Sequence, residues 1–238
     1  MNINYQYIKN NKETILFLHG WGADKNSFNF FSNNLKNQFD ILTIDFIGHG
    51  QSEQLNYVYT VYDYAVDIFR LIKKMDIKNI TIICHSFGAR VAILLATIFN
   101  IKINKLIVIG GAGVRPRFNI FCKISIYNYK LKKWLNTKLK TNFCLDKYGS
   151  QEYKSLDKIG KQTFSNIVNF DEKKYIKLIK CPTLLIWGKM DKSTPLYMGK
   201  IYHKLIKNSK LITIEKGDHF CFLQYKDKVQ YNINKFLY

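Results

Sequence analysis

Three residues, Ser86, Asp191 and His219, have the types and the chain order that nucleophilic acyl chemistry uses. A serine hydroxyl is a weak nucleophile until an imidazole removes its proton during attack, and a carboxylate orients that imidazole and stabilises its charged form. The sequence therefore predicts Ser86 as the nucleophile, His219 as the general base and Asp191 as the acid. This chemistry requires no cofactor, and we expect none.

The residues around Ser86 indicate how a nucleophile would be exposed. Ile80–Ile83 has the pattern of a buried strand, and Phe87–Phe99 that of an alanine-rich helix. A strand that turns into a helix within one residue strains the backbone of the serine and projects its hydroxyl above the sheet edge. Gly88 supplies the small residue needed two positions later, whereas Cys84 stands where the G-x-S-x-G pattern has its first glycine.

Other candidate residues also follow predicted strands. The strands Thr14–Leu18, Thr183–Trp187 and Leu211–Ile214 are followed by the turns His19-Gly20-Trp21-Gly22, Gly188-Lys189-Met190-Asp191 and Gly217-Asp218-His219-Phe220. Open parallel sheets bind ligands beyond the carboxyl ends of their strands, so these turns are expected to meet at one site. We expect the backbone N–H groups of Trp21 and Phe87 to form the oxyanion hole, and both residues to line the substrate pocket.

Between these strands the sequence predicts further elements in alternation. They are a helix near residues 27–36, a strand over Asp40–Ile44, a helix near residues 61–75 and a strand over Lys105–Ile109. Such alternation predicts a mostly parallel sheet with helices on both faces. It stops between residues 114 and 180. We therefore predict a core made of residues 1–113 and 181–238, with residues 114–180 inserted as a helical cap.

The sequence resembles the α/β-hydrolase superfamily over nearly its whole length. The resemblance rests on the His19–Gly22 turn, the loop Asp45–Ser52, Ser86, Asp191 and His219, and the order Ser, Asp, His is the order that this fold uses. It implies an α/β-hydrolase fold with a cap inserted before the strand that carries the acid. Relatives of this superfamily mostly begin with a longer antiparallel hairpin, so we expect a trimmed sheet edge before Thr14.

The resemblance also implies a class of reaction. Dehalogenases and epoxide hydrolases of the superfamily use an aspartate nucleophile, whereas Ser86 implies acyl transfer. The Trp21 turn and the compact cap are similar to those of small cytoplasmic carboxylesterases, including enzymes that cleave a methyl ester from an acyl chain on acyl carrier protein. We expect a serine hydrolase that cleaves a small to medium carboxylic ester or thioester. The alternatives are a C–C bond hydrolase, a lyase of the menaquinone-pathway type and a catalytically silent ligand-binding protein.

Purely structural roles are open for the same residues. Asp191 could cap the helix that begins near Thr194-Pro195, and His219 could be a loop residue with a backbone contact. Asp218 is a weaker candidate for the acid than Asp191, because adjacent side chains diverge.

Four more polar residues near these motifs are expected to support the site rather than react. We expect His49 and Ser52 to brace their loop, His85 to neighbour the site and Arg90 to be a buried ion-pair partner.

The composition fits a single globular domain. The chain has 238 residues, of which 47% are hydrophobic. No apolar run approaches the roughly 18 residues of a membrane span, and the N-terminus shows no signal-peptide pattern, so we expect a cytoplasmic protein without integral membrane association. The five cysteines and five histidines match no metal-ligand motif, so we expect no metal. Cys84 and Cys181 are expected to be free thiols.

The charge is unevenly distributed. The formal net charge is +20, and residues 114–180 hold 16 basic and 5 acidic residues, a net +11 against +9 for the rest. The lysine bias also fits an AT-rich genome, with no functional cause. A basic cap would attract anionic substrates or an acidic acyl carrier protein. We expect no nucleic-acid partner, because arginine is scarce and no recognition motif is present.

One cap segment has helical periodicity. Ile120, Ile124, Tyr127, Leu131 and Leu135 recur at helical spacing, and the lysines between them fall on other faces. We expect this helix to pack on the mouth of the site, and the alternative is a membrane-binding helix.

Overall fold

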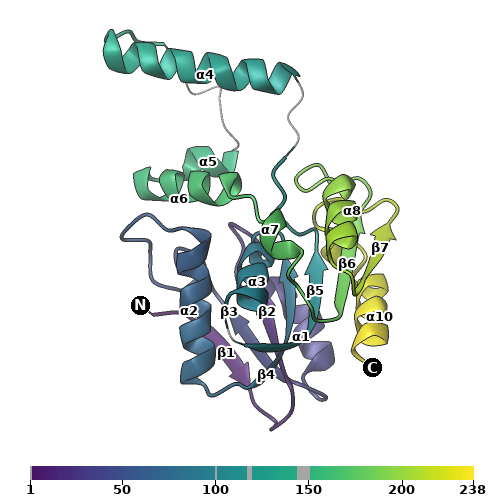
Figure 1. The fold of residues 1–238 in the computed structure, drawn as a ribbon. Coiled ribbons are helices and arrows are strands. Elements are labelled where there is room, and N and C mark those ends of the chain that lie inside the picture. The colour runs from purple at the N-terminus through teal and green to yellow at the C-terminus, as the bar shows by residue number, and fades with distance from the viewer. Residues whose placement is uncertain (1, 100, 117–119, 144–150) are drawn as a thin grey trace.

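A seven-stranded sheet forms the centre of the protein in a computed structural model that describes residues 2–99, 101–116, 120–143 and 151–238 (Figure 1). The strands are β1 (Tyr5–Ile8), β2 (Thr14–Leu18), β3 (Asp40–Ile44), β4 (Asn79–His85), β5 (Lys102–Ile109), β6 (Thr183–Gly188) and β7 (Ser209–Ile214). Their spatial order is β1-β3-β2-β4-β5-β6-β7. Strand β1 runs antiparallel to β3, and the other neighbours are parallel. The predicted mostly parallel α/β sheet is confirmed.

Helices cover both faces of this sheet. In chain order they are the 3-10 helix η1 (Lys25–Phe28), α1 (Asn29–Leu35), α2 (Val61–Lys74), α3 (Phe87–Thr97), α4 (Ile120–Lys138), α5 (Gln151–Ser155), α6 (Lys158–Asn169), α7 (Lys173–Ile176), α8 (Leu196–Leu205), α9 (Cys221–Gln224) and α10 (Lys226–Leu237). Helices α2, α3 and α8 bury side chains such as Tyr64 and Tyr202 in one core. Helices α1, α9 and α10 bury Phe31 and Ile233 in the core on the other face.

The helices on both faces of the sheet explain the composition of the central strands. Every residue of β2, β3 and β6 is buried, which suits strands rich in Ile and Leu. The strands predicted from apolar runs are confirmed. Strand β4 begins at Asn79 rather than at Ile80, and β5 begins at Lys102 rather than at Lys105.

The edge beside β3 holds a strand that the sequence analysis did not identify. Strand β1 pairs with β3 from Tyr5 opposite Ile44 to Ile8 opposite Ile41. Within the described part of the chain, β1 is the only strand beyond β3.

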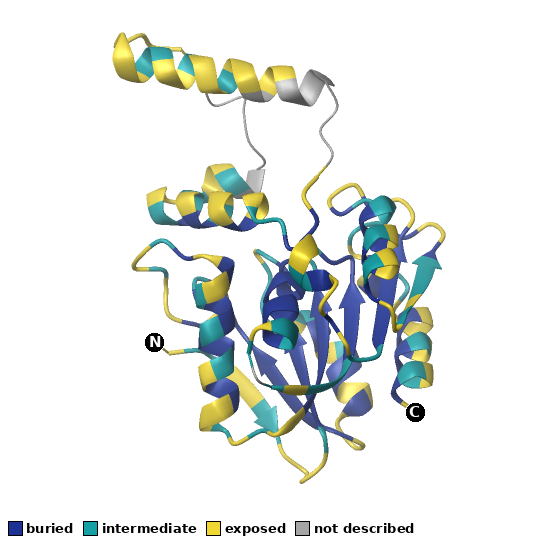
Figure 2. Ribbon diagram, viewed as in Figure 1, coloured by how far each residue is buried: buried dark blue, intermediate teal, exposed yellow. Residues whose placement is uncertain are grey.

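Helices α4 to α7 lie between β5 and β6, in the segment predicted to form the cap (Figure 1). The predicted helix is present as α4, but the prediction that it packs on the mouth of the site is wrong. Its stripe residues Ile124, Tyr127 and Leu131 are 51%, 67% and 42% exposed (Figure 2). Helix α6 supplies the apolar side chains at the mouth, among them Phe164 and Ile167.

The segment between β5 and β6 leaves the core at Gly113 and returns to it nearby, at Glu172. The backbone N–H of Glu172 donates to the carbonyl oxygen of Gly113 at 2.8 Å. The Arg90 guanidinium of α3 donates to the Glu172 carboxylate at 3.0 Å and to the carbonyl oxygen of Phe170 at 2.6 Å. Both ion-pair partners are buried, which confirms Arg90 as a buried ion-pair partner.

Within the residues that the structure describes, no helix has the length and apolar character that crossing a lipid bilayer demands.

Candidate active site

Ser86 occupies the sharp turn between β4 and α3. Its backbone has φ 49° and ψ −112°, a left-handed conformation that costs a non-glycine residue about 1–3 kcal/mol. Its N–H donates to the carbonyl oxygen of Ile109 at 3.1 Å, which ties the turn to the end of β5. The strained strand-to-helix turn predicted from the sequence is confirmed.

The two positions flanking the serine differ in how much space they have. A Cβ atom at Gly88 would lie 2.2 Å from the carbonyl oxygen of Leu18 and 2.8 Å from that of His19, so no larger residue fits there. At the other position, Cys84 is fully buried and its Sγ donates to the carbonyl oxygen of Ile107 at 3.4 Å. Burial raises the pKa of the Cys84 thiol, which therefore stays protonated and does not compete with Ser86 as a nucleophile.

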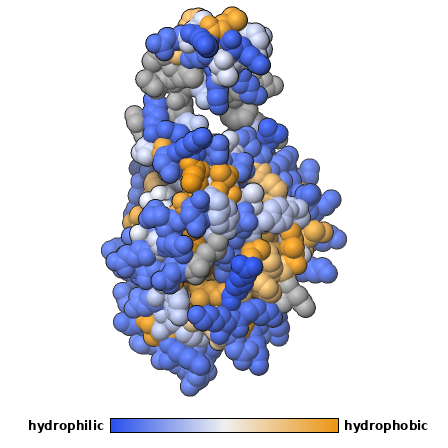
Figure 3. Space-filling model, turned by 90° about the vertical axis from the view of Figure 1, so that its left-hand side faces the viewer, coloured by the Kyte–Doolittle hydropathy of each residue, from blue (hydrophilic) through white to orange (hydrophobic). Residues whose placement is uncertain are grey.

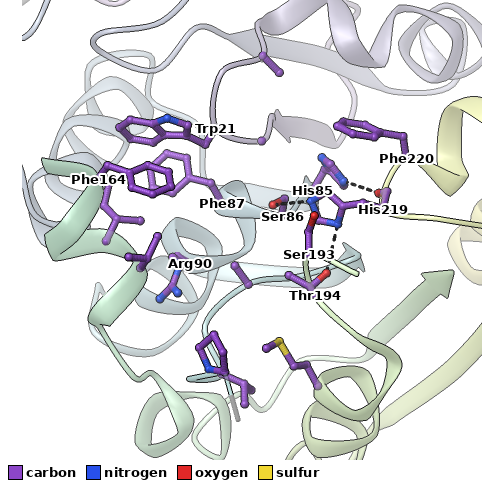
Figure 4. A pocket seen from close by; sticks show the side chains of 18 residues that line it. Trp21, His85, Ser86, Phe87, Arg90, Phe164, Ser193, Thr194, His219 and Phe220 are labelled. Atoms are coloured by element: carbon purple, nitrogen blue, oxygen red, sulfur yellow. Dashed lines mark hydrogen bonds between the residues drawn. The ribbon is translucent and has the colours of Figure 1, made fainter. Parts of the chain in front are cut away.

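The three predicted reactive side chains form one hydrogen-bonded chain. His219 Nε2 lies 2.9 Å from Ser86 Oγ (Figure 4). His219 Nδ1 lies 2.9 Å from Asp191 Oδ2. With Nδ1 protonated, the ring donates to the carboxylate and accepts from the serine hydroxyl. This is the tautomer in which an imidazole can remove the serine proton.

The loop after β6 fixes the Asp191 carboxylate. The N–H groups of Ser193 and Thr194 donate to Oδ1 at 2.9 and 2.8 Å, and the Thr194 hydroxyl lies 2.8 Å from Oδ2. Burial alone would raise the pKa of Asp191, but hydrogen bonds from His219 and Thr194 and the charge of His219 bring it below its ordinary value. Asp191 thus caps its own loop with one oxygen and contacts His219 with the other.

The sequence analysis did not assign Thr194 to the site. Its hydroxyl also lies 2.9 Å from the carbonyl oxygen of Gly110 and 3.3 Å from His219 Nδ1. An aspartate followed by Ser and Thr two and three residues later is the signal that would have indicated this capped turn.

A largely apolar cavity of about 250 Å³ opens onto Ser86 and His219 (Figure 4). Trp21 and Phe87 line it with ring centroids 5.5 Å apart, and the ring of Phe164 from α6 lies 5.3 Å from that of Trp21. The two residues predicted to line the pocket are therefore at the cavity wall, next to a residue of the segment predicted to form the cap.

Comparison with known proteins agrees with this geometry. Residues 13–121 match the family described as alpha/beta hydrolase fold. The chain is 27% identical over 255 residues to the AB hydrolase superfamily protein YisY of Bacillus subtilis, covering 93% of this chain and 90% of that protein. The chain has the α/β-hydrolase fold. The resemblance noted from the sequence is thereby confirmed.

Solved structures show the same α/β-hydrolase fold at lower identity. An esterase from Exiguobacterium antarcticum superimposes with a TM-score of 0.78 at 22% identity, covering 98% of this chain and 94% of that one. A bromoperoxidase from Bacillus anthracis superimposes with a TM-score of 0.78 at 21% identity, covering 99% and 95%. Matches at this identity show the fold alone.

Two backbone groups remain the predicted oxyanion hole. Phe87 is the first residue of α3, and the first N–H groups of a helix have no partner within it. Trp21 lies in the turn closed by the Ala23 N–H, which donates to the Gly20 carbonyl oxygen at 3.2 Å.

The neighbouring carboxylate, Asp218, is engaged elsewhere. It accepts hydrogen bonds from the N–H of Phe220 at 2.7 Å and from the side-chain amide of Gln224 at 2.8 Å. The imidazole of His219 instead contacts Asp191, as the sequence analysis predicted.

His85 neighbours the site, as predicted. Its Nε2 lies 2.9 Å from the carbonyl oxygen of His219, and because a carbonyl only accepts, Nε2 is the donor. Burial, with a smaller effect of the nearby His219, lowers the pKa of His85 to about 3. His85 is therefore neutral at ordinary pH.

Ser52 and His49 brace their loop rather than face the cavity. The Ser52 hydroxyl donates to the carbonyl oxygen of Asp45 at 2.6 Å and accepts from the N–H of Asn4 at 2.8 Å. The His49 ring lies edge-on to Trp21, with centroids 4.6 Å apart, and supports that wall of the pocket from behind.

Three of the five cysteine thiols belong to the described side chains. Cys84, Cys181 and Cys221 are free, and the side chains of Cys122 and Cys144 lie outside the described residues. Among the side chains that are described, no three His, Cys, Asp or Glu gather as a metal site.

Proposed function

We propose that this protein is a serine hydrolase that cleaves a carboxylic ester or thioester of a small to medium acyl substrate. One observation carries the proposal: an unbroken hydrogen-bonded chain leads from Asp191 through His219 to Ser86, whose hydroxyl faces an apolar cavity.

Acylation uses each of these groups in turn. Ser86 Oγ attacks the ester carbonyl carbon while His219 Nε2 accepts the hydroxyl proton, and Asp191 stabilises the resulting imidazolium. The N–H groups of Phe87 and Trp21 are proposed to stabilise the negative oxygen of the tetrahedral intermediate. His219 then protonates the leaving alcohol or thiol, and the acyl group remains on Ser86.

Deacylation repeats these steps with water. His219 removes a proton from the water molecule, the hydroxide attacks the acyl carbon, and the same proton returns to Ser86 Oγ as the acid is released. The chemistry is complete without a metal or an organic cofactor.

The cavity supports an acyl group of limited size. Its volume is about 250 Å³, and its wall is formed by aromatic and aliphatic side chains such as Trp21, Phe87, Phe164 and Met198. Arg90 also lines it, but its guanidinium is paired with Glu172, so the cavity favours an apolar chain over a second carboxylate. The esterase with a similar structure supports ester cleavage as the reaction.

The charge of the segment 114–180 supports a further part of the proposal. Its net +11 would attract an anionic substrate, or one carried on an acidic acyl carrier protein, toward the cavity.

The decisive test combines active-site labelling with turnover. The purified protein is incubated with a fluorophosphonate probe and with p-nitrophenyl esters of increasing acyl length, beside the variants Ser86→Ala and Ser165→Ala. Ser165 is an exposed serine on α6 and serves as the matched control. We expect labelling at Ser86, a preference for short to medium chains, and a loss of the order of a million-fold in Ser86→Ala alone. Folded protein that neither labels nor turns over any ester would refute the proposal and favour a ligand-binding role.

A further inference from the structure

Helix α4 exposes a stripe of large apolar side chains. Ile124, Tyr127, Leu131 and Trp134 are 51%, 67%, 42% and 54% exposed. They are three or four residues apart, so they lie on one side of the helix. In Figure 1 the helix stands apart from the rest of the described chain, and in Figure 3 hydrophobic side chains lie at the top of the molecule among hydrophilic ones. Exposed apolar groups gathered in this way mark an interaction surface.

Lysines border this stripe, and no acidic residue interrupts them. The helix from Ile120 to Lys138 contains five lysines and no Asp or Glu. Lys130 and Lys132 fall on opposite sides of the stripe at 100° per residue. Lys133 adds charge on the far side of the helix.

We propose that α4 binds the surface of a membrane that contains anionic phospholipid. A helix with Trp, Tyr, Leu and Ile on one side and lysines around it lies in the plane of the interface, with its apolar side at the boundary of headgroups and acyl chains. Trp134 and Tyr127 carry amphipathic rings that suit this boundary, and each lysine near the surface gains from the negative potential of the lipids.

Two other occupants fit the same surface less well. A second copy of α4 would bring lysines against lysines, because the helix carries charge of one sign. An acidic protein such as an acyl carrier protein would pair with the lysines but would meet a convex single helix, with Leu131 and Trp134 projecting rather than forming a groove.

Membrane binding would orient the rest of the protein. Helix α4 lies on the side of the molecule that holds α5 and α6 (Figure 1), and α6 lines the cavity through Phe164, Ile167 and Val168. Binding through α4 would therefore hold the cavity near the lipid surface. The binding itself is independent of the proposed function, since it involves neither Ser86 nor His219.

The test is co-sedimentation of the full chain with vesicles. Vesicles of phosphatidylcholine alone are compared with an equimolar mixture of phosphatidylcholine and phosphatidylglycerol, at low and high salt. The stripe variant is Leu131→Glu with Trp134→Glu, and the charge variant is Lys130→Glu, Lys132→Glu and Lys133→Glu. The control variant reverses three exposed lysines elsewhere, Lys204→Glu, Lys207→Glu and Lys210→Glu. Circular dichroism and the thermal midpoint verify that each variant folds.

We expect the wild-type protein and the control variant to bind the anionic vesicles, more weakly at high salt. The stripe and charge variants should each bind at least tenfold more weakly. The proposal is overturned by three results: no binding to anionic vesicles, an equal loss in the control variant, or a dimer in solution that the stripe variant abolishes. Because sedimentation needs no turnover, its failure is distinguishable from failure of the ester hydrolysis.

Discussion

Nε2 of His85 lies 2.9 Å from the backbone carbonyl oxygen of His219. The residue before the proposed nucleophile therefore fixes the backbone of the proposed general base. Since the buried His85 is neutral, this bond does not change with pH in the range where a hydrolase works. His85 also lines the cavity, and we assign it a positioning role because its hydrogen bond is to the backbone of His219.

We predict that His85→Phe lowers kcat about tenfold with little change in KM. The loss corresponds to a hydrogen bond worth about 1.5 kcal/mol in positioning the imidazole. His85→Gln keeps a donor in this position and should recover part of kcat, with the same pH profile as the wild type. Steady-state kinetics on a short p-nitrophenyl ester measure both, and a tenfold rise in KM at constant kcat would argue for a substrate contact instead.

We predict that Asp191→Asn lowers kcat about a thousandfold or more, because an amide would favour the wrong tautomer of His219. Asp218→Asn is the matched control, since Asp218 neighbours His219 in sequence but bonds to Phe220 and Gln224. It should retain most of the activity. The two variants are compared by turnover of the same ester, and a larger loss in Asp218→Asn would reverse the assignment of the acid.

We predict that Asp191 stabilises the fold in a pH-dependent way. Its pKa in the folded protein is below its ordinary value of 3.8, so the unfolded chain binds the proton more tightly. The stabilisation is complete well above 3.8 and is lost as the pH falls through the folded pKa. Urea unfolding of wild type and Asp191→Asn from about pH 5 downward should show the difference in unfolding free energy shrinking. A difference that grows toward acid would contradict this sign.

We predict that Gly88→Ala destabilises the protein by about 3 kcal/mol or more, because the new methyl group would collide with the backbone of β2. Ser86→Ala lies in the same turn, adds no atoms and serves as the control. Urea unfolding measures both, and equal stability of the two variants would show that α3 can shift away from β2.

The strands were predictable from the sequence because burial on both faces leaves uninterrupted apolar runs, such as Thr14–Leu18 and Thr183–Trp187. Strand β1 was not, since its residues are exposed or half-buried and its pairing with β3 depends on the completed sheet. The three side chains of the candidate site were predictable because each follows a strand whose end lies at the same edge.

Contacts between residues that are distant in the sequence were harder to predict. Arg90 was recognised as half of an ion pair, but its partner Glu172 is distant in sequence and meets it only in the fold. Ile124, Tyr127 and Leu131 of the α4 stripe were recognised from their spacing, whereas Trp134 was not. Periodicity identifies an apolar face without identifying what covers it.

The hydrogen bond between Glu172 and Gly113 closes the chain on itself at the base of α4, α5 and α6. The segment between these two residues, called the module below, leaves and re-enters the rest of the fold at neighbouring positions, and α6 packs on the core through Ile167. Ser86 precedes the module, and Asp191 and His219 follow it. An engineer could thus exchange the module for another of different shape and redirect the scaffold to new compounds, while the reacting groups keep their places.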